Sequence, residues 1–253
     1  MNHTIKTQLN HRTIREFKEK EVPENLLKEF ISVMQRTASS TGMQTSSIIR
    51  ITDRKVKKQI AEVCKQEYVG RAPELFIFIV DAYRNNRIAE KKTGKLFPAS
   101  HDMDRFFQGW TDSCLAAQNL TNAVESEGLG AVFLGSILND TDKIIEILKL
   151  PKLTFPVVGV AFGYSNQEPQ LKPRMDMNLR LFENEYKEFE NYMEEIEDYD
   201  EEMQTYYDLR DANRRVDSFS KQVIDKLENV LENRIKILNS AIKQGFDLNL
   251  EKE

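Results

Sequence analysis

Cysteine and histidine are both scarce in this sequence of 253 residues. The two cysteines, Cys64 and Cys114, each stand in an amphipathic pattern, which indicates neither a disulfide framework nor a zinc site. The three histidines, His3, His11 and His101, are too far apart for a local metal-binding motif. We therefore expect two buried, reduced thiols and no metal.

Long hydrophobic runs are also missing. None approaches the roughly 20 apolar residues of a membrane-spanning helix. The first residues, MNHTIKTQLNHR, lack the apolar segment of a signal peptide. With 40% hydrophobic and 30% charged residues, the composition predicts a globular protein, and we expect it in the cytoplasm.

The sequence has no surplus of basic residues either. Its net charge is −5, and residues 183–202 contain eleven acidic residues against the single base Lys187. This balance disfavours binding to nucleic acid. Apolar and aromatic residues recur within the acidic run every three or four positions, which predicts a helix with one docked face and one solvated face.

Helix and strand patterns alternate along the rest of the chain. The sequence predicts strands at residues 47–51, 74–80, 131–134 and 155–162, of which those at 74–80 and 131–134 are expected to be buried. Amphipathic runs predict helices at residues 24–36, 54–65, from 107 to the glycines at 128 and 130, and 140–148, whereas residues 83–105 have no regular pattern. The tail from Glu183 has a helical pattern throughout. This order indicates an α+β or α/β domain with a mixed sheet flanked by helices.

Cations gather in two short segments. The stretch HRTIREF places two arginines and a histidine within five residues, and Lys172 and Arg174 flank a proline in LKPR. Alternate residues of an extended chain point the same way, and arginine and lysine suit phosphate oxygens. One phosphoryl group could therefore be held by His11, Arg12, Thr13, Lys172 and Arg174. The alternative for each segment alone is a solvated surface.

Two loops carry polar groups that suit a planar ligand. The loop TASSTGMQ offers Ser39, Ser40, Thr41 and Gln44, which have short hydroxyl and amide groups. A buried strand ends at Gly135-Ser136, where backbone N–H groups are open to close approach. An ordinary polar loop and an ordinary turn are the alternatives.

Seven stretches together resemble the flavin-dependent nitroreductase superfamily, in its larger NADPH-preferring branch. They occur in the family's order and spacing across roughly residues 4 to 190. The stretches are HRTIREF, SSTGMQTSSIIRITD, QEYV, AAQNLTNAVESEGLGAVFLGSILN, VGVAFGY, LKPR and ENEY. Each is weak alone, but seven in register make a specific signal.

The resemblance implies an FMN site. By similarity, the phosphate group is held by His11, Arg12, Thr13, Lys172 and Arg174. Arg15 is expected near the pyrimidine edge of the flavin, where a cation stabilises the negative charge of the reduced ring. Further flavin contacts are expected from Ser39, Ser40, Gln66, Leu134, Gly135 and Ser136. A second glycine is common in the family where this sequence has Ser136.

The resemblance also implies an intertwined homodimer with FMN at the interface. Residues 1–182 are expected to form the FMN-binding core, and residues 183–253 a helical C-terminal extension that packs on the partner subunit. The extension carries an apolar stripe, which comprises Val223, Ile224, Leu227, Val230, Leu231, Ile235 and Leu238. The alternative is a helix that packs on its own subunit.

A basic loop in this branch recognises the 2′-phosphate of NADPH, and Arg210, Arg214 and Arg215 stand in that place. The expected activity is ping-pong hydride transfer from NAD(P)H through flavin N5 to nitroaromatics, quinones or free flavin, without a catalytic side chain. Two alternatives remain, a flavin-binding or redox-sensing protein with little turnover, and a helical interaction protein that binds no flavin.

Overall fold

The computed structural model describes residues 1–208, 214–229 and 231–247. Packing divides the chain into two compact units, residues 1–167 with 231–253, and residues 168–230. These boundaries differ from those of the expected core and extension. Which segments hold a cofactor stays a prediction.

A four-stranded sheet forms the centre of the first unit. Its strands are β1 (Ser46–Arg50), β2 (Glu74–Asp81), β3 (Gly130–Leu134) and β4 (Thr154–Gly163), in the order β1-β2-β4-β3. All three adjacent pairs are antiparallel, and Thr13 adds an isolated parallel bridge to Ala131 of β3. Among the described residues, the sheet is therefore mixed only through that bridge. Strand direction was not predictable because the connections are long enough for either direction.

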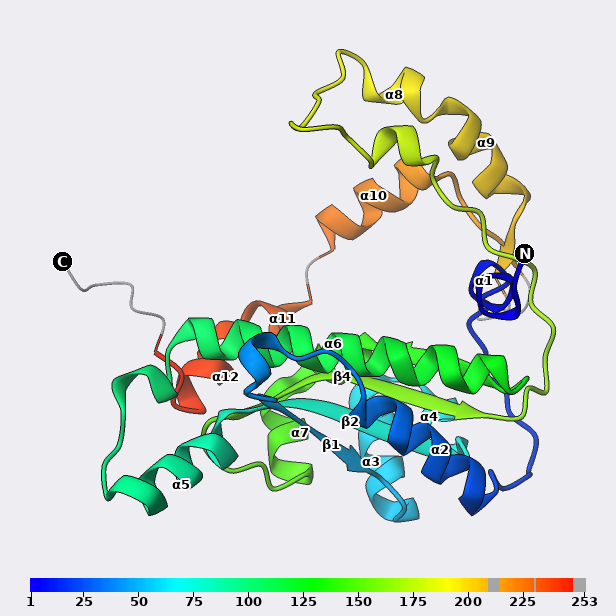
Figure 1. Ribbon diagram of the computed structural model, residues 1–253. Helices are drawn as coiled ribbons and strands as arrows, with labels where there is room; N and C mark the ends of the chain where they lie inside the picture. Colours follow the sequence, from blue (N-terminus) through cyan, green and yellow to red (C-terminus); the bar gives the residue numbers. More distant parts are fainter. Residues whose placement is uncertain (209–213, 230, 248–253) are drawn as a thin grey trace. The chain divides into compact units, whose positions relative to one another are not determined.

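Helices cover both faces of the sheet, as expected. Phe76 and Phe78 of β2 pack among residues of α2 (Glu24–Gln35) and α6 (Met103–Ser126). Alternate residues of β2 contribute to a second core. That core includes residues of α3 (Arg54–Cys64), α4 (Glu67–Arg71), α7 (Thr141–Ile147) and α12 (Ile237–Lys243). Figure 1 shows α6 extending along the sheet, with α1 (His3–Leu9) beside its C-terminal end.

Several helix ends follow from local chemistry. The carboxylate of Asp53 accepts a hydrogen bond from the backbone N–H of Lys55 at 2.6 Å, so α3 begins at Arg54, the first residue of the predicted helix. Asp140 caps α7 in the same way through Lys143 N, at 3.0 Å. The chain leaves α6 through Gly128, which has a φ of +73°.

Two expectations in the first unit were wrong. The irregular segment 83–105 contains a helix, α5 (Ala82–Thr93), whose only fully buried residue is Ala82. A helix that is almost wholly solvated needs few apolar residues, so its sequence shows little apolar periodicity. Cys64 is buried as expected, but Cys114 is exposed, because it lies on α6 outside the stripe of the helix that packs on the core.

The second unit is not wholly helical. Its helices are α8 (Tyr192–Glu195), α9 (Glu197–Thr205) and α10 (Phe219–Glu228), and two short strands, β5 (Tyr207–Asp208) and β6 (Arg214–Arg215), pair between α9 and α10. The rings of Tyr199 and Phe219 pack at 5.2 Å, which joins α9 to α10. The remaining short helix of the tail, α11 (Glu232–Ile235), belongs to the first unit with α12.

No helix among the described residues is long and apolar enough to cross a membrane. The same residues contain no group of three or more histidine, cysteine, aspartate or glutamate side chains that could hold a metal ion.

Candidate functional site

The stretch HRTIREF is extended and forms no helix. Thr13 bridges to Ala131 at the start of β3, and Ile14 N donates to Ala131 O at 3.0 Å. Gly130 makes this approach possible, because a Cβ on it would lie 2.3 Å from Ile14 Cγ1. The segment therefore lies along the free edge of β3.

The two arginines of this segment have no acidic partner in the part of the first unit that the structure describes. Among the described residues of the first unit, no carboxylate forms an ion pair with Arg12 or Arg15. Arg12 Nη1 donates to Asn10 O at 3.2 Å, and the backbone N–H of Arg15 donates to Gln167 Oε1 at 3.1 Å. Both side chains are half-buried. Two cations without counter-charges at one sheet edge suit an anionic ligand.

The imidazole ring of His11 is oriented by a contact with the largely buried side chain of Glu125. Its Nδ1 lies 2.6 Å from Glu125 Oε1, and the Glu125 side chain is only 10% exposed. A carboxylate only accepts hydrogen bonds, so the proton of this contact belongs to Nδ1. The ring is thereby fixed with Nε2 available for another contact.

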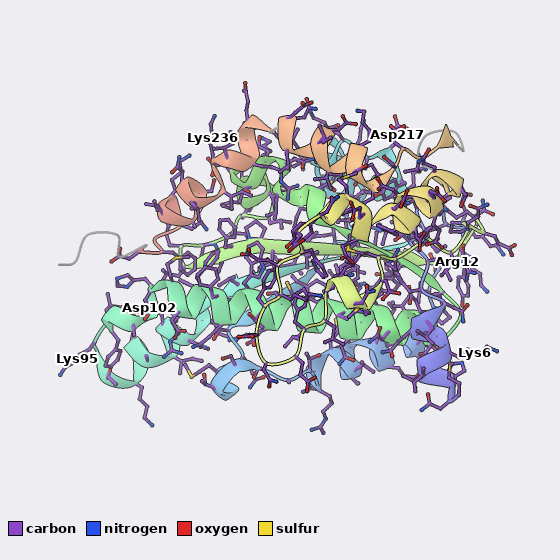
Figure 2. The ribbon with its side chains drawn as sticks, turned by 90° about the horizontal axis from the view of Figure 1, so that it is seen from above. Lys6, Arg12, Lys95, Asp102, Asp217 and Lys236 are labelled. Carbon is purple, nitrogen blue, oxygen red and sulfur yellow. The ribbon has the colours of Figure 1, made fainter. Side chains whose placement is uncertain are left out.

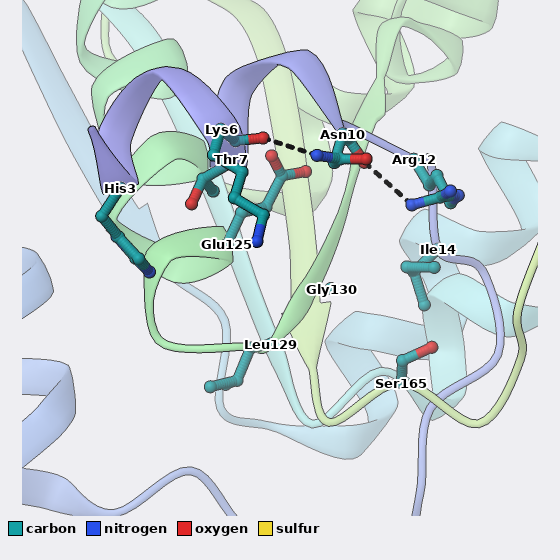
Figure 3. Close-up of a pocket in the computed structure, with 10 residues that line it drawn as sticks. All are labelled: His3, Lys6, Thr7, Asn10, Arg12, Ile14, Glu125, Leu129, Gly130 and Ser165. Atoms are coloured by element: carbon teal, nitrogen blue, oxygen red, sulfur yellow. Dashed lines mark hydrogen bonds between the residues drawn. The ribbon is translucent and has the colours of Figure 1, made fainter. Parts of the chain in front are cut away.

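A pocket of about 490 Å³ opens beside this segment. Figure 3 shows its lining, which comes from α1, the extended segment, the end of α6, the start of β3 and the segment just after β4. The lining residues are His3, Lys6, Thr7, Asn10, Arg12, Ile14, Glu125, Leu129, Gly130 and Ser165. Glu125 is the one carboxylate among them and is engaged by His11, so the pocket offers an anion two cations, Lys6 and Arg12.

The turn after β3 forms a second part of the site. Ser136 Oγ donates to Gln66 Oε1 at 2.8 Å, although the two residues are far apart in sequence. Gln66 precedes α4, and Arg71 at the other end of α4 donates to Glu16 Oε1 at 2.9 Å, beside Arg15. The turn, Gln66 and the HRTIREF segment therefore belong to one side of the sheet.

Gly135 leaves this turn open. A Cβ built on it meets no heavy atom within 4 Å, whereas the preceding Leu134 is buried. A planar ligand can therefore approach the backbone closely.

Sequence reasoning missed Arg234 of α11. Its Nη1 lies 3.3 Å from Gly135 O and 3.3 Å from Asn139 Oδ1, so the tail adds a cation to the turn. The sequence carries no local signal for this contact.

Ser39 and Ser40 lie beside α6, away from the HRTIREF segment. Ser40 N donates to Asp112 Oδ1 at 2.8 Å, and Thr45 N donates to Asp112 Oδ2 at 3.2 Å. Asp112 is 2% exposed and lies in the first half of α6. Thr41 and Gln44, with φ values of 51° and 49°, give the loop a conformation that these buried hydrogen bonds maintain.

Within one chain, these two serines are remote from the other predicted flavin contacts. Asp112, which holds Ser40, and Glu125, which holds His11, are 13 positions apart on α6, or about 20 Å. β1, which follows the serine loop, and β3 are opposite edges of the sheet. In Figure 2, Arg12 lies at one end of the unit and Asp102, the cap of α6, at the other.

The remaining predicted residues belong to the second unit. Lys172 and Arg174 are exposed on a segment without regular structure, and Arg174 Nη1 donates to Lys172 O at 3.0 Å. Arg214 and Arg215 form β6, whose backbone pairs with β5. Arg210 lies outside the described residues.

Similarity to known proteins extends over almost the whole chain. A model of the nitroreductase family matches residues 9–164, and a model of the family's C-terminal domain matches residues 172–249. The oxygen-insensitive NADPH nitroreductase of Salmonella typhimurium is 34% identical over 247 residues, which cover 97% of this chain and 99% of that protein. The FMN reductase (NADPH) of Bacillus subtilis is 30% identical over 252 residues, which cover 98% and 100%.

Solved structures show the same similarity. The structure of NADPH:FMN oxidoreductase from Vibrio harveyi, complexed with NAD+, matches with a TM-score of 0.85 and 30% identity. The match covers 97% of this chain and 99% of that one.

Proposed function

Since the chain belongs to the nitroreductase family, we propose that it is an FMN-dependent oxidoreductase that takes hydride from NADPH and reduces small electron-poor acceptors. One structural observation carries the proposal. Two arginines that form no ion pair with a carboxylate among the described residues lie on the edge of β3, and the same strand ends in a turn with open space at Gly135.

We assign the phosphate of FMN to the cations Arg12, Lys172 and Arg174, together with His11 and Thr13. In this proposal Arg12 and Thr13 contact the anion, supported by His11, which Glu125 fixes so that Nε2 is available. Lys172 and Arg174 complete the set in this proposal. Arginine forks and a lysine charge together match the two negative charges of a phosphate monoester.

The flavin ring is assigned to the turn after β3. Gln66 supplies an amide, and Leu134, Gly135 and Ser136 bring backbone groups near N5, where Gly135 leaves room for a planar ring. Arg15 lies near the pyrimidine edge in this assignment, and Arg234 adds a second positive charge at Gly135. Fixed cations in a partly dehydrated site stabilise the charge that develops on reduction.

Bound FMN would supply the hydride chemistry, which no side chain of this site can perform. The protein's own part is to bind, orient and stabilise charge. We assign no nucleophile and no general acid. The 2′-phosphate of NADPH is assigned to Arg210, Arg214 and Arg215, and a ping-pong order follows if donor and acceptor use the same open face in turn. Candidate acceptors are nitroaromatics, quinones and free flavin.

The proposal includes a homodimer, because one chain does not bring Ser39 and Ser40 to the other contacts. A second copy can supply these serines if its α6 crosses the first chain's site. Exposed apolar side chains fit such an interface. Phe107 and Leu115 of α6 are 61% and 45% exposed, and Leu227, Ile235 and Leu238 of the predicted stripe are 76%, 68% and 54% exposed.

The phosphate assignment is tested by the double variant Arg12→Ala/Arg174→Ala. We expect the purified variant to lose its FMN during gel filtration, because two of the positive charges that hold the phosphate are gone. Arg54→Ala, at an exposed position on α3, is the matched control and should keep the flavin. Full flavin occupancy in the folded double variant would contradict the assignment.

The dimer is tested by mixing two variants that each lack FMN, Arg12→Ala/Arg174→Ala and Ser39→Asp/Ser40→Asp. If each site draws on both subunits, mixed dimers contain one intact site, and flavin binding returns in part after mixing. If all these residues serve the site of their own chain, mixing restores nothing.

A further inference from the structure

The turn after β3 contains a hydrogen bond whose two residues lie 70 positions apart. Ser136 Oγ lies 2.8 Å from Gln66 Oε1, and Ser136 is half-buried. Gln66 stands at the N-cap of α4, yet its side chain makes no capping bond. Within the described residues, the amide of Gln66 has no side-chain partner other than Ser136.

The direction of this bond decides what Gln66 can offer a ligand. An amide has one acceptor group and one group with two N–H donors. If the hydroxyl donates to Oε1, the Nε2 group is turned away from Ser136 and keeps both donors. If the amide were reversed, Oε1 would face the ligand instead and could only accept.

The hydroxyl donates to Oε1 in the structure, and the nearby Cys64 is compatible with this direction. Burial raises the pKa of the Cys64 thiol to about 11, and a hydrogen bond with Ser136 lowers it again only in part. The sulfur is therefore protonated at neutral pH and does not need the proton of the Ser136 hydroxyl, which remains available for Gln66 Oε1.

We propose that Ser136 is a positioning residue, which fixes the amide of Gln66 so that Nε2 donates to the carbonyl oxygens of the flavin's pyrimidine ring. The inference rests on the proposed FMN site. A glycine at position 136, which is common in the family that the sequence resembles, cannot form this bond. With Ser136 in this place, the protein presents the flavin with a Gln66 amide of fixed orientation, whereas with glycine the amide could rotate.

This arrangement has a measurable consequence for the flavin. Reduction places negative charge on the pyrimidine ring, so a fixed N–H donor stabilises the reduced form more than the oxidised form. Loss of the Ser136 hydroxyl should therefore weaken binding of reduced FMN about 2- to 10-fold, the range of one hydrogen bond, with a smaller effect on oxidised FMN. The midpoint potential of the bound flavin falls accordingly.

The test is a double-mutant cycle on the flavin-loaded protein. Ser136→Ala is made in the wild-type chain and in Gln66→Leu, and the midpoint potential and the Kd of oxidised FMN are measured for all four proteins. Ser136→Thr is the matched control, because it keeps the hydroxyl and should keep the wild-type potential.

We expect Ser136→Ala to lower the potential in the wild-type chain and to change it little in Gln66→Leu. An equal change in both backgrounds, or none in the wild-type chain, would overturn the positioning role while the proposed function stands. A wild-type protein that takes up no FMN would overturn both.

Discussion

Replacement of Gly130 by alanine should displace the segment that carries the anion-binding residues. The new Cβ would lie 2.3 Å from Ile14 Cγ1, 2.6 Å from Ile14 Cβ and 2.9 Å from Ile14 Cγ2. Ile14 is only 6% exposed and its Cβ is attached to the backbone, so a change of rotamer does not relieve the overlap. The backbone must move away from β3, which strains the bond from Ile14 N to Ala131 O.

The expected cost is that of overpacking, about 1–3 kcal/mol. For a chain of this size, each kcal/mol corresponds to a fall in Tm of roughly 2–4 °C, so Gly130→Ala should melt about 2–12 °C below the wild type. Because Thr13 and Arg15 flank Ile14, the same displacement should also weaken FMN binding.

Gly135→Ala is the matched control, since it makes the same chemical change at the other end of β3. Its Cβ meets open space, so the flavin-free variant should melt as the wild type does. That Cβ nevertheless occupies the side assigned to the flavin, so FMN binding should weaken. Thermal unfolding of flavin-free protein and titration with FMN separate the two effects. The reasoning is refuted if Gly130→Ala melts with the wild type, or if Gly135→Ala loses as much stability.

Two further predictions concern buried groups. Asp112→Asn keeps the shape but leaves one of the two loop N–H donors without an acceptor, so urea unfolding should show a loss of about 1–3 kcal/mol; an unchanged midpoint would contradict it. Because the pKa of Cys64 is raised in the folded state to about 11 from 9.0, its contribution to stability is fully present below about pH 9 and is lost as the pH rises towards 11. Cys64→Ala should therefore remove up to about 2–3 kcal/mol of the decline in unfolding free energy between these pH values, and an identical decline in both proteins would refute this.

The elements with a clear apolar pattern were predictable from the sequence. The apolar run of β2 and the long pattern of α6 gave these elements to within a few residues, because burial on the sheet fixes their composition. The helix α5 was missed, because it buries almost nothing.

The arrangement of the site was harder to predict from the sequence. The HRTIREF segment is extended because Gly130 leaves space for Ile14, and nothing within the segment indicates this neighbour. The distance of Ser40 from His11 follows from strand order, which local patterns do not encode. The contacts of Arg234 and of Ser136 join residues 99 and 70 positions apart in the chain.

The most direct test of the account is the absorption spectrum of the purified protein, recorded without oxygen before and after addition of NADPH. We predict flavin bands that bleach with NADPH and return when a quinone or nitroaromatic compound is added. Bands that neither NADPH nor NADH bleaches would indicate a flavin-binding or sensing protein. A colourless protein that cannot be reconstituted with FMN would contradict the central claim.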